Sequence, residues 1–173
     1  MHHPWKGGLL MVCLCLTLST HAYASNVIMR LDRLKGEVKE PKDFVQLRSF
    51  VLESRFDPGT QRTVMGPLQL TKKVDSTTAH IFSAFARSIA SKADKESAEV
   101  WFRTTGGERA TYMSIHLKKH RIESHNVRMV DGEMVETFEI GYDWISVKYF
   151  TFDKNGKPSK TPVIMEYANP RTK

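Results

Sequence analysis

The sequence predicts a mainly β protein with a single helix, and three observations support this fold class. Short segments with alternating apolar and polar residues recur along most of the chain. Turn signals rich in Gly, Pro, Asn and Asp separate these segments, and only one stretch has the apolar spacing of a helix. Many short strands at regular spacing are typical of a β-sandwich or β-barrel. A length of 173 residues, 40% of them hydrophobic, suits one domain with its own core.

Three strands are predicted in the first half of the chain, at residues 27–32, 44–53 and 68–74. Asp57-Pro58-Gly59-Thr60 is a strong turn signal between the second and third strands. Gly and Pro recur in residues 55–67 and alternation fails there, so this segment is expected to be an exposed loop.

The predicted helix follows the third strand. Asp75-Ser76-Thr77-Thr78 supplies candidate N-cap residues, and residues 91–95 are polar and are expected to end the helix. Between these two ends, apolar residues recur at spacings of three and four, which places a broad apolar stripe on one face of the helix. The residues of this stripe are Ala79, Phe82, Ala86 and Ile89, with Ile81 and Phe85 in a neighbouring row.

Strands return in the second half of the chain, at residues 98–103, 111–117, 122–130, 135–152 and 163–167. Turn signals separate them at residues 105–108, at Asp131-Gly132 and at Asn155-Gly156. Within residues 135–152 the alternation changes parity near Trp144, which predicts a bulge or a bend in one long strand.

Residues 1–24 are predicted to be a secretory signal peptide. Lys6 precedes an apolar run at residues 7–18, and Ala22-Tyr23-Ala24 provides a cleavage site, so cleavage is expected after Ala24. The run is too short to anchor the protein, so a secreted or periplasmic chain without stable membrane insertion is expected. A wrongly assigned start codon is the alternative. Both cysteines, Cys13 and Cys15, lie in this segment, so residues 25–173 contain no disulfide.

The sequence contains no pattern that indicates catalysis, so we expect no enzyme activity, cofactor or metal site. Residues 105–108 are Gly-rich, but no Gly-Lys-Ser follows, as a phosphate-binding loop would require. His116 and His120 would lie about 13 Å apart on an extended strand and could not bind one zinc ion. The basic run at residues 118–121 has no aromatic residues beside it, so nucleic acid is not an expected partner.

The order of several short motifs resembles that of the Hcp family, the ring-forming tube subunits of bacterial type VI secretion. The opening strand and turn at residues 29–37, Ser49-Phe50, and residues 70–75 leading into Ile81-Phe82 are similar to that family. Gly107-Glu108 before residues 112–117, and residues 136–140 before residues 145–149, extend the resemblance over nearly all of residues 25–173.

The resemblance implies that residues 25–173 form a small β-barrel of two antiparallel sheets with one flanking α-helix. It also implies a homo-hexameric ring that stacks into a hollow tube. The implied partners are other copies of the chain, the tip and sheath proteins of the secretion machinery, and effector proteins bound in the lumen. Ring-to-ring contacts are expected in the segment 55–67, through Arg55, Asp57, Gln61, Arg62, Val64 and Met65.

The export signal leaves a second function open, because Hcp tubes assemble in the cytoplasm and family members usually lack such a signal. The alternative is an exported periplasmic or extracellular binding or virulence module that keeps the fold without tube assembly. A hydrolase acting on the cell envelope is a third possibility, which only the export signal favours.

Overall fold

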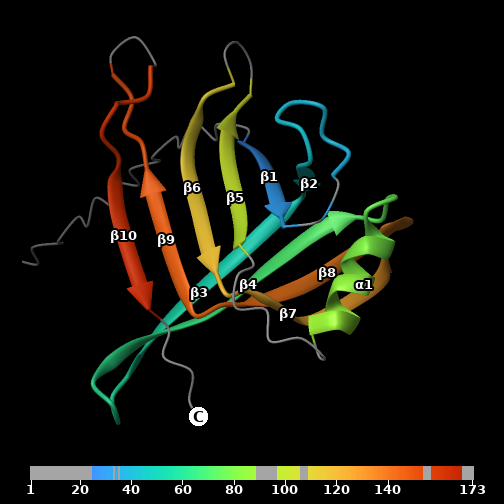
Figure 1. The fold of residues 1–173 in the computed structure, drawn as a ribbon, viewed down its shortest axis with the longest axis horizontal. Helices are drawn as coiled ribbons and strands as arrows, with labels where there is room; N and C mark the ends of the chain where they lie inside the picture. The colour runs from blue at the N-terminus through green and yellow to red at the C-terminus, as the bar shows by residue number, and fades with distance from the viewer. Residues whose placement is uncertain are drawn as a thin grey trace, which may run out of the picture.

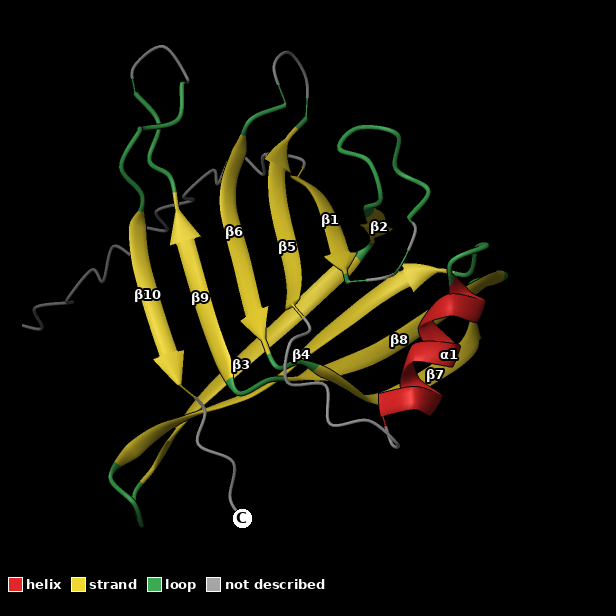
Figure 2. Ribbon diagram, in the orientation of Figure 1, coloured by secondary structure: helices red, strands yellow, loops and turns green. Residues whose placement is uncertain are grey.

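A computed structural model gives the fold as two antiparallel sheets and one helix (Figures 1 and 2). It describes residues 25–32, 34, 36–88, 97–105, 109–153 and 157–168. The predicted signal peptide, residue Ile89, the polar segment 91–95 and the Gly106-Gly107 and Asn155-Gly156 turns lie outside the described residues.

The larger sheet has six strands in the order β10-β9-β6-β5-β1-β2, with every neighbouring pair antiparallel. Its strands are β1 (Ser25–Leu31), β2 (Val45–Leu47), β5 (Ser97–Thr104), β6 (Thr111–Lys118), β9 (Trp144–Tyr149) and β10 (Val163–Ala168).

The smaller sheet has four strands in the order β3-β4-β8-β7, again antiparallel throughout. Its strands are β3 (Ser49–Asp57), β4 (Arg62–Lys73), β7 (Arg121–Val130) and β8 (Glu133–Gly141). The helix α1 (Thr78–Ser88) follows β4 and packs on β7, the edge strand of this sheet (Figure 1).

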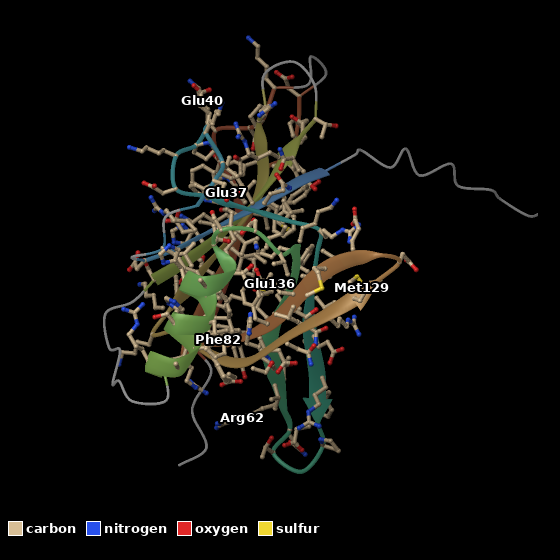
Figure 3. The ribbon with its side chains drawn as sticks, turned by 90° about the vertical axis from the view of Figure 1, so that its right-hand side faces the viewer. Glu37, Glu40, Arg62, Phe82, Met129 and Glu136 are labelled. Atoms are coloured by element: carbon tan, nitrogen blue, oxygen red, sulfur yellow. The ribbon has the colours of Figure 1, made fainter. Side chains whose placement is uncertain are left out.

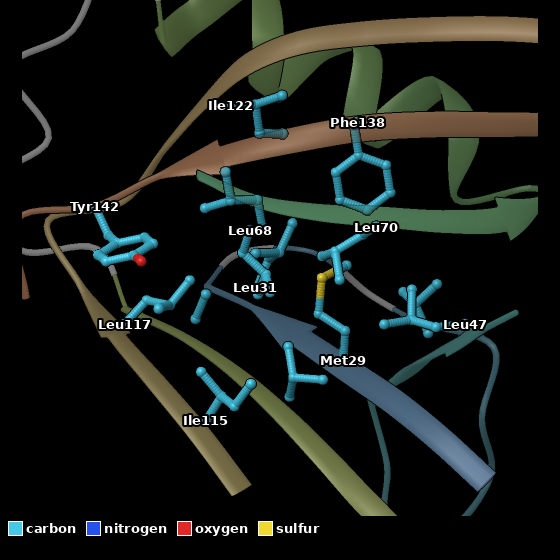
Figure 4. Packing of buried hydrophobic residues seen from close by; sticks show 14 of the residues in the cluster. Met29, Leu31, Leu47, Leu68, Leu70, Ile115, Leu117, Ile122, Phe138 and Tyr142 are labelled. Carbon is cyan, nitrogen blue, oxygen red and sulfur yellow. The ribbon is translucent and has the colours of Figure 1, made fainter. Parts of the chain in front are cut away.

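The core lies between the two sheets, because strand alternation directs one apolar row of each sheet inward. Figure 4 shows side chains of both sheets meeting there, including Met29 and Ile115 from the larger sheet and Leu70 and Phe138 from the smaller one. The expected two antiparallel sheets and single helix are confirmed. The sheets are not closed into a barrel, because hydrogen-bonded order ends at β10 and β2 in one sheet and at β3 and β7 in the other.

Two of the predicted strands are each divided between the sheets. Residues 135–152 form β8 in the smaller sheet and β9 in the larger one, and Tyr142-Asp143 crosses between them. The parity change near Trp144 therefore comes from this crossing and not from a bulge in one strand. Residues 44–53 divide in the same way into β2 and β3, on either side of Arg48.

The predicted loop at residues 55–67 is instead a β-hairpin formed by β3 and β4. Its turn is the predicted one: Asp57 accepts hydrogen bonds from the Gly59 backbone N–H at 2.9 Å and from the Thr60 hydroxyl at 3.0 Å. The alternation fails because most residues near the hairpin tip are exposed on both faces, so no apolar row is needed there.

The helix buries only part of the predicted apolar stripe. Its start is confirmed, since the Asp75 carboxylate accepts the Thr77 N–H at 2.8 Å. Ile81 is fully buried and Phe85 is partly buried against the core. Ala79, Phe82 and Ala86 of the predicted stripe face solvent, so the helix carries an exposed apolar row.

Candidate assembly surfaces

The β3–β4 hairpin extends away from the body of the molecule, at the lower left of Figure 1. It contains all six residues for which ring-to-ring contact was predicted. Arg55, Gln61 and Arg62 are exposed, and Asp57 and Val64 are partly exposed. Met65 is 8% exposed and belongs to the hydrophobic core, so it cannot take part in a surface contact without disturbing the fold.

Phe56 is the most prominent apolar side chain of the hairpin, and the sequence reasoning did not single it out. It lies opposite Thr63 in the strand register and is 65% exposed. The side chain of Thr60 and the backbone N–H of Gly59 hydrogen-bond Asp57 and hold the pKa of that carboxyl below its usual range. The turn thus keeps a charged carboxylate next to an exposed aromatic ring.

Two tyrosines hold the hairpin, one nearer its base and one near its turn. The Tyr142 hydroxyl donates a hydrogen bond to the carbonyl oxygen of Gly66 at 2.8 Å, and the Tyr167 hydroxyl donates to the carbonyl of Thr63. Tyr142 lies in the crossing between the sheets, and Tyr167 lies on β10. Burial raises the pKa of Tyr142 from 10.0 to about 12, so its hydroxyl keeps the proton it donates even where an ordinary tyrosine begins to ionise. The hairpin is therefore held by the crossing between the sheets and by β10.

Outside the hairpin, the molecule has two exposed apolar surfaces. The first, the β10 surface, consists of Val163, Ile164 and Met165. These side chains are 66%, 52% and 45% exposed. Successive residues of a strand point to opposite faces, so β10 exposes apolar side chains on both faces of the sheet. Among the described strands β10 pairs with β9 alone, so its other backbone edge is open to a further strand or chain.

A second apolar surface, the α1–β7 surface, lies at the other end of the molecule. It comprises the exposed helix row of Ala79, Phe82 and Ala86, together with Val127 and Met129 of β7 and Met134 of β8. Phe82 is 58% exposed and Met129 is 62% exposed, and Met129 lies opposite Met134 in the strand register. Figure 3 views the molecule from this end, where Phe82 and Met129 are labelled.

A buried ionic network lies beneath this second surface and fixes the start of α1. Lys72 of β4 and Glu136 of β8 are both fully buried, and the ammonium of Lys72 also donates to Asp75 at 2.8 Å. Glu136 further accepts a hydrogen bond from the Thr78 hydroxyl at 2.8 Å and lies 2.8 Å from Nε2 of His125. Glu136 is therefore closed to solvent and to any partner at the surface.

The chemistry of the described side chains is that of ion pairs and not of a metal centre. No group of three described His, Cys, Asp or Glu residues is arranged to hold a metal ion. His116 instead pairs with Glu99, at 3.1 Å between Nε2 and Oε1, and Glu99 also pairs with Arg30 at 2.9 Å. In the part of the chain that the structure describes, no helix has the length and apolar character to cross a membrane.

Solved structures share this fold. One, described as a type six secretion system protein, is 18% identical, with 84% of this chain and 96% of that chain covered and a TM-score of 0.69. Hcp1 from Salmonella typhimurium is 13% identical, with 83% and 94% covered and a TM-score of 0.64. A type VI secretion system effector from Yersinia pestis is 11% identical, with 82% and 98% covered and a TM-score of 0.64.

These likenesses show that the chain has the fold of these secretion-system proteins. The family described as "Type VI secretion system effector, Hcp" matches residues 29–149. The chain therefore belongs to the Hcp family, as its motifs indicated. A search of the curated proteins found no match.

Proposed function

We propose that this chain is a tube subunit of type VI secretion, which assembles into homo-hexameric rings that stack end to end. Its role is structural and not enzymatic. Membership of the Hcp family supports the class of function. The observation that carries the assembly is the presence of unlike exposed surfaces on one chain: the β10 surface at one end and the α1–β7 surface at the other.

Two unlike surfaces favour a head-to-tail contact, because each copy can present one surface to its neighbour on either side. Such contacts close into a ring when the rotation between neighbours permits closure. The projecting hairpin adds a third surface, with Phe56 exposed at its side, and it is suited to contact a copy in the next ring. Its partners outside the ring would be the tip and sheath proteins of the machinery and effectors held in the lumen.

We also propose that residues 1–24 direct export and are removed after Ala24, which places the protein in the periplasm or outside the cell. The support is the basic start, apolar run and small residues before the cleavage site. If export prevents tube assembly, the chain is a periplasmic or extracellular binding or virulence module. The exposed apolar surfaces would then serve a different partner.

Mass measurements on the protein recovered from cells that express the full-length chain test both parts of the proposal. Light scattering after gel filtration, with electron micrographs of the same peak, is expected to give a hexamer with ring-shaped images. Mass spectrometry of the chain is expected to show an N-terminus at Ser25. A monomer at high concentration would refute assembly and favour the binding module, and an intact N-terminus in cells would refute export.

A further inference from the structure

We infer that the larger sheet binds the phosphate group of a small ligand on the face that points away from the core. The site lies on β6 and β9, which run side by side in this sheet (Figure 1). Ile115 and Leu117 of β6 and Ile145 of β9 point into the core, so the residues that alternate with them point outwards. The inference is independent of the proposed ring, because every residue of the site belongs to one chain.

Three pairs of directly opposed residues form this outward site, here called the β6–β9 site. They are His116 with Ser146, Ser114 with Lys148, and Lys118 with Trp144. Opposed residues on one face of a sheet have Cβ atoms about 5 Å apart, and successive pairs follow at about 7 Å. The long side chains of Lys118 and Lys148 therefore reach the central pair from its two sides.

The hydroxyl of Ser146 is the observation that points to a ligand. Ser146 is 1% exposed, and its Oγ has no hydrogen-bond partner among the described residues. A buried hydroxyl without a partner is costly, and an oxyanion is a strong acceptor for it. Ser114 places a second hydroxyl beside it and is 8% exposed. Both hydroxyls lie at the level of the strands, and the flexible lysine side chains can move apart to admit a ligand.

Two ammonium groups make the site attractive to an anion. Lys148 is half-buried, and Nζ of Lys118 lies 4.1 Å from the centroid of the Trp144 ring. Neither lysine forms an ion pair with another residue in the part of the chain that the structure describes. Ammonium groups that flank a buried hydroxyl favour an anion with several acceptor oxygens, and a phosphate group supplies them.

The imidazole of His116 adds a further donor. Its Nε2 lies 3.1 Å from Oε1 of Glu99, which leaves Nδ1 for a ligand. Glu99 also pairs with Arg30 at 2.9 Å, so the negative charge beside His116 is already balanced. A protonated imidazole in this position would donate from Nδ1 to a phosphate oxygen.

Two further carboxylates lie near the site. Asp143 precedes Trp144 and lies 4.0 Å from Arg121, which balances its charge. Glu166 is exposed on β10, directly opposite Ser146, and has no cation within ion-pair distance among the described residues. Two unpaired ammonium groups therefore face one unpaired carboxylate, and the site keeps a positive charge that Glu166 weakens.

The depth of the hydroxyls favours a small molecule over a membrane surface. A flat anionic membrane would contact the ends of Lys118 and Lys148 and would not reach Ser146, which lies beneath them at the strand. A free phosphate ion or a phosphate ester such as a sugar phosphate can enter between the two lysines.

Binding of three probes to the full-length protein tests the site. Calorimetric titrations use inorganic phosphate and glucose 6-phosphate, and sedimentation measures binding to phosphatidylglycerol vesicles. The variants are Ser146→Ala, Lys148→Met and Glu166→Gln. Lys42→Met, which removes an exposed lysine of the β1–β2 loop, is the matched control. Thermal unfolding of each variant establishes that it is folded, and Ser146→Ala is expected to melt no lower than the parent, because it loses a hydroxyl without a partner.

Glucose 6-phosphate is expected to bind, and both Ser146→Ala and Lys148→Met are expected to weaken it by about ten-fold or more. Glu166→Gln should strengthen binding, and Lys42→Met should leave it unchanged. Binding of inorganic phosphate with the same variant pattern would also support the site and would identify the free ion as a ligand. Unchanged affinity in folded Ser146→Ala would overturn the inference, because non-specific attraction to lysines needs no hydroxyl. Binding to vesicles alone, or to none of the probes, would overturn it as well, whatever the oligomeric state.

Discussion

The ammonium of Lys72 lies 2.5 Å from Oε1 of Glu136, and neither side chain is exposed to solvent. The two residues come from adjacent strands, β4 and β8, and lie directly opposite each other in the register. Asp75 and the carbonyl oxygen of Lys73 accept the other two protons of the ammonium, at 2.8 and 2.6 Å. All three donors of Lys72 are therefore used, which is the condition under which a buried charge is tolerated.

Replacing Lys72 by methionine is expected to destabilise the protein by about 3 kcal/mol or more, because Glu136 would stay buried without its main counter-charge. Chemical denaturation followed by circular dichroism measures this free energy. The double variant Lys72→Met, Glu136→Leu is expected to lose less than the two single variants together, since no charge is left unpaired.

Lys73→Met is the matched control for this cycle. Lys73 forms an ion pair with Glu133 at 2.6 Å on the same strand pair, but both side chains are well exposed. Its removal is expected to leave the free energy of unfolding nearly unchanged. Equal losses for Lys72→Met and Lys73→Met would show that burial of the Lys72–Glu136 pair does not matter.

The sequence predicted the strands well where one face is buried and the other is more exposed, as in β5, because alternation then reports the fold directly. The Lys72–Glu136 pair could also have been found by this rule. Lys72 continues the buried row of Leu68 and Leu70, and Glu136 continues the row of Phe138, so both charges fall on core positions.

Alternation could not reveal which sheet a strand joins or which side of a short helix is covered. The Tyr142-Asp143 crossing transfers the chain between sheets in two residues, and the pattern shows only a change of parity. Phe82 has the spacing of a buried residue but remains exposed, because α1 packs at the edge of the smaller sheet and not over its middle. Among the predicted contact residues, Met65 is buried for a tertiary reason as well: it lies where the hairpin joins the core.

Ionisation of Tyr142 is expected to lower the stability of the protein at alkaline pH. Its pKa is raised from 10.0 to about 12, mainly by burial. A raised folded-state pKa contributes stability that is fully present below pH 10 and is lost as the pH rises towards 12. We expect the free energy of unfolding to decrease over this range, as measured by urea titrations at several pH values.

Tyr142→Phe isolates this contribution. The variant loses the hydrogen bond to Gly66 and is expected to be less stable at neutral pH, by about 1 kcal/mol. Between pH 10 and 12 its stability should decrease less steeply than that of the parent protein. Parallel curves for the two proteins would contradict the assignment of the alkaline loss to Tyr142.

Gly36 is required by a close approach of two backbone segments. A Cβ atom at this position would lie 2.0 Å from the carbonyl oxygen of Phe44, which itself accepts a hydrogen bond from Val38 at 2.9 Å. Gly36→Ala is therefore expected to displace the segment that seats Phe44 against Trp101, at a cost of about 2 kcal/mol or more. Thermal unfolding measures the effect, and Gly66→Ala, whose Cβ would have no contact shorter than 3.6 Å, is the control. Similar melting temperatures for the two variants would contradict this prediction.

Phe56 gives a test of the hairpin that is separate from the ring contact. Because this side chain is 65% exposed and lies away from the core, Phe56→Ser is expected to leave the melting temperature of the subunit nearly unchanged. If the hairpin joins one ring to the next, the variant should still form rings in electron micrographs but fewer and shorter stacks at the same protein concentration. Phe82→Ser, on the α1–β7 surface, should have the opposite effect and weaken the ring itself. Stacks of parental length from Phe56→Ser would exclude this aromatic ring from the stacking contact, since its loss removes the largest exposed apolar group of the hairpin.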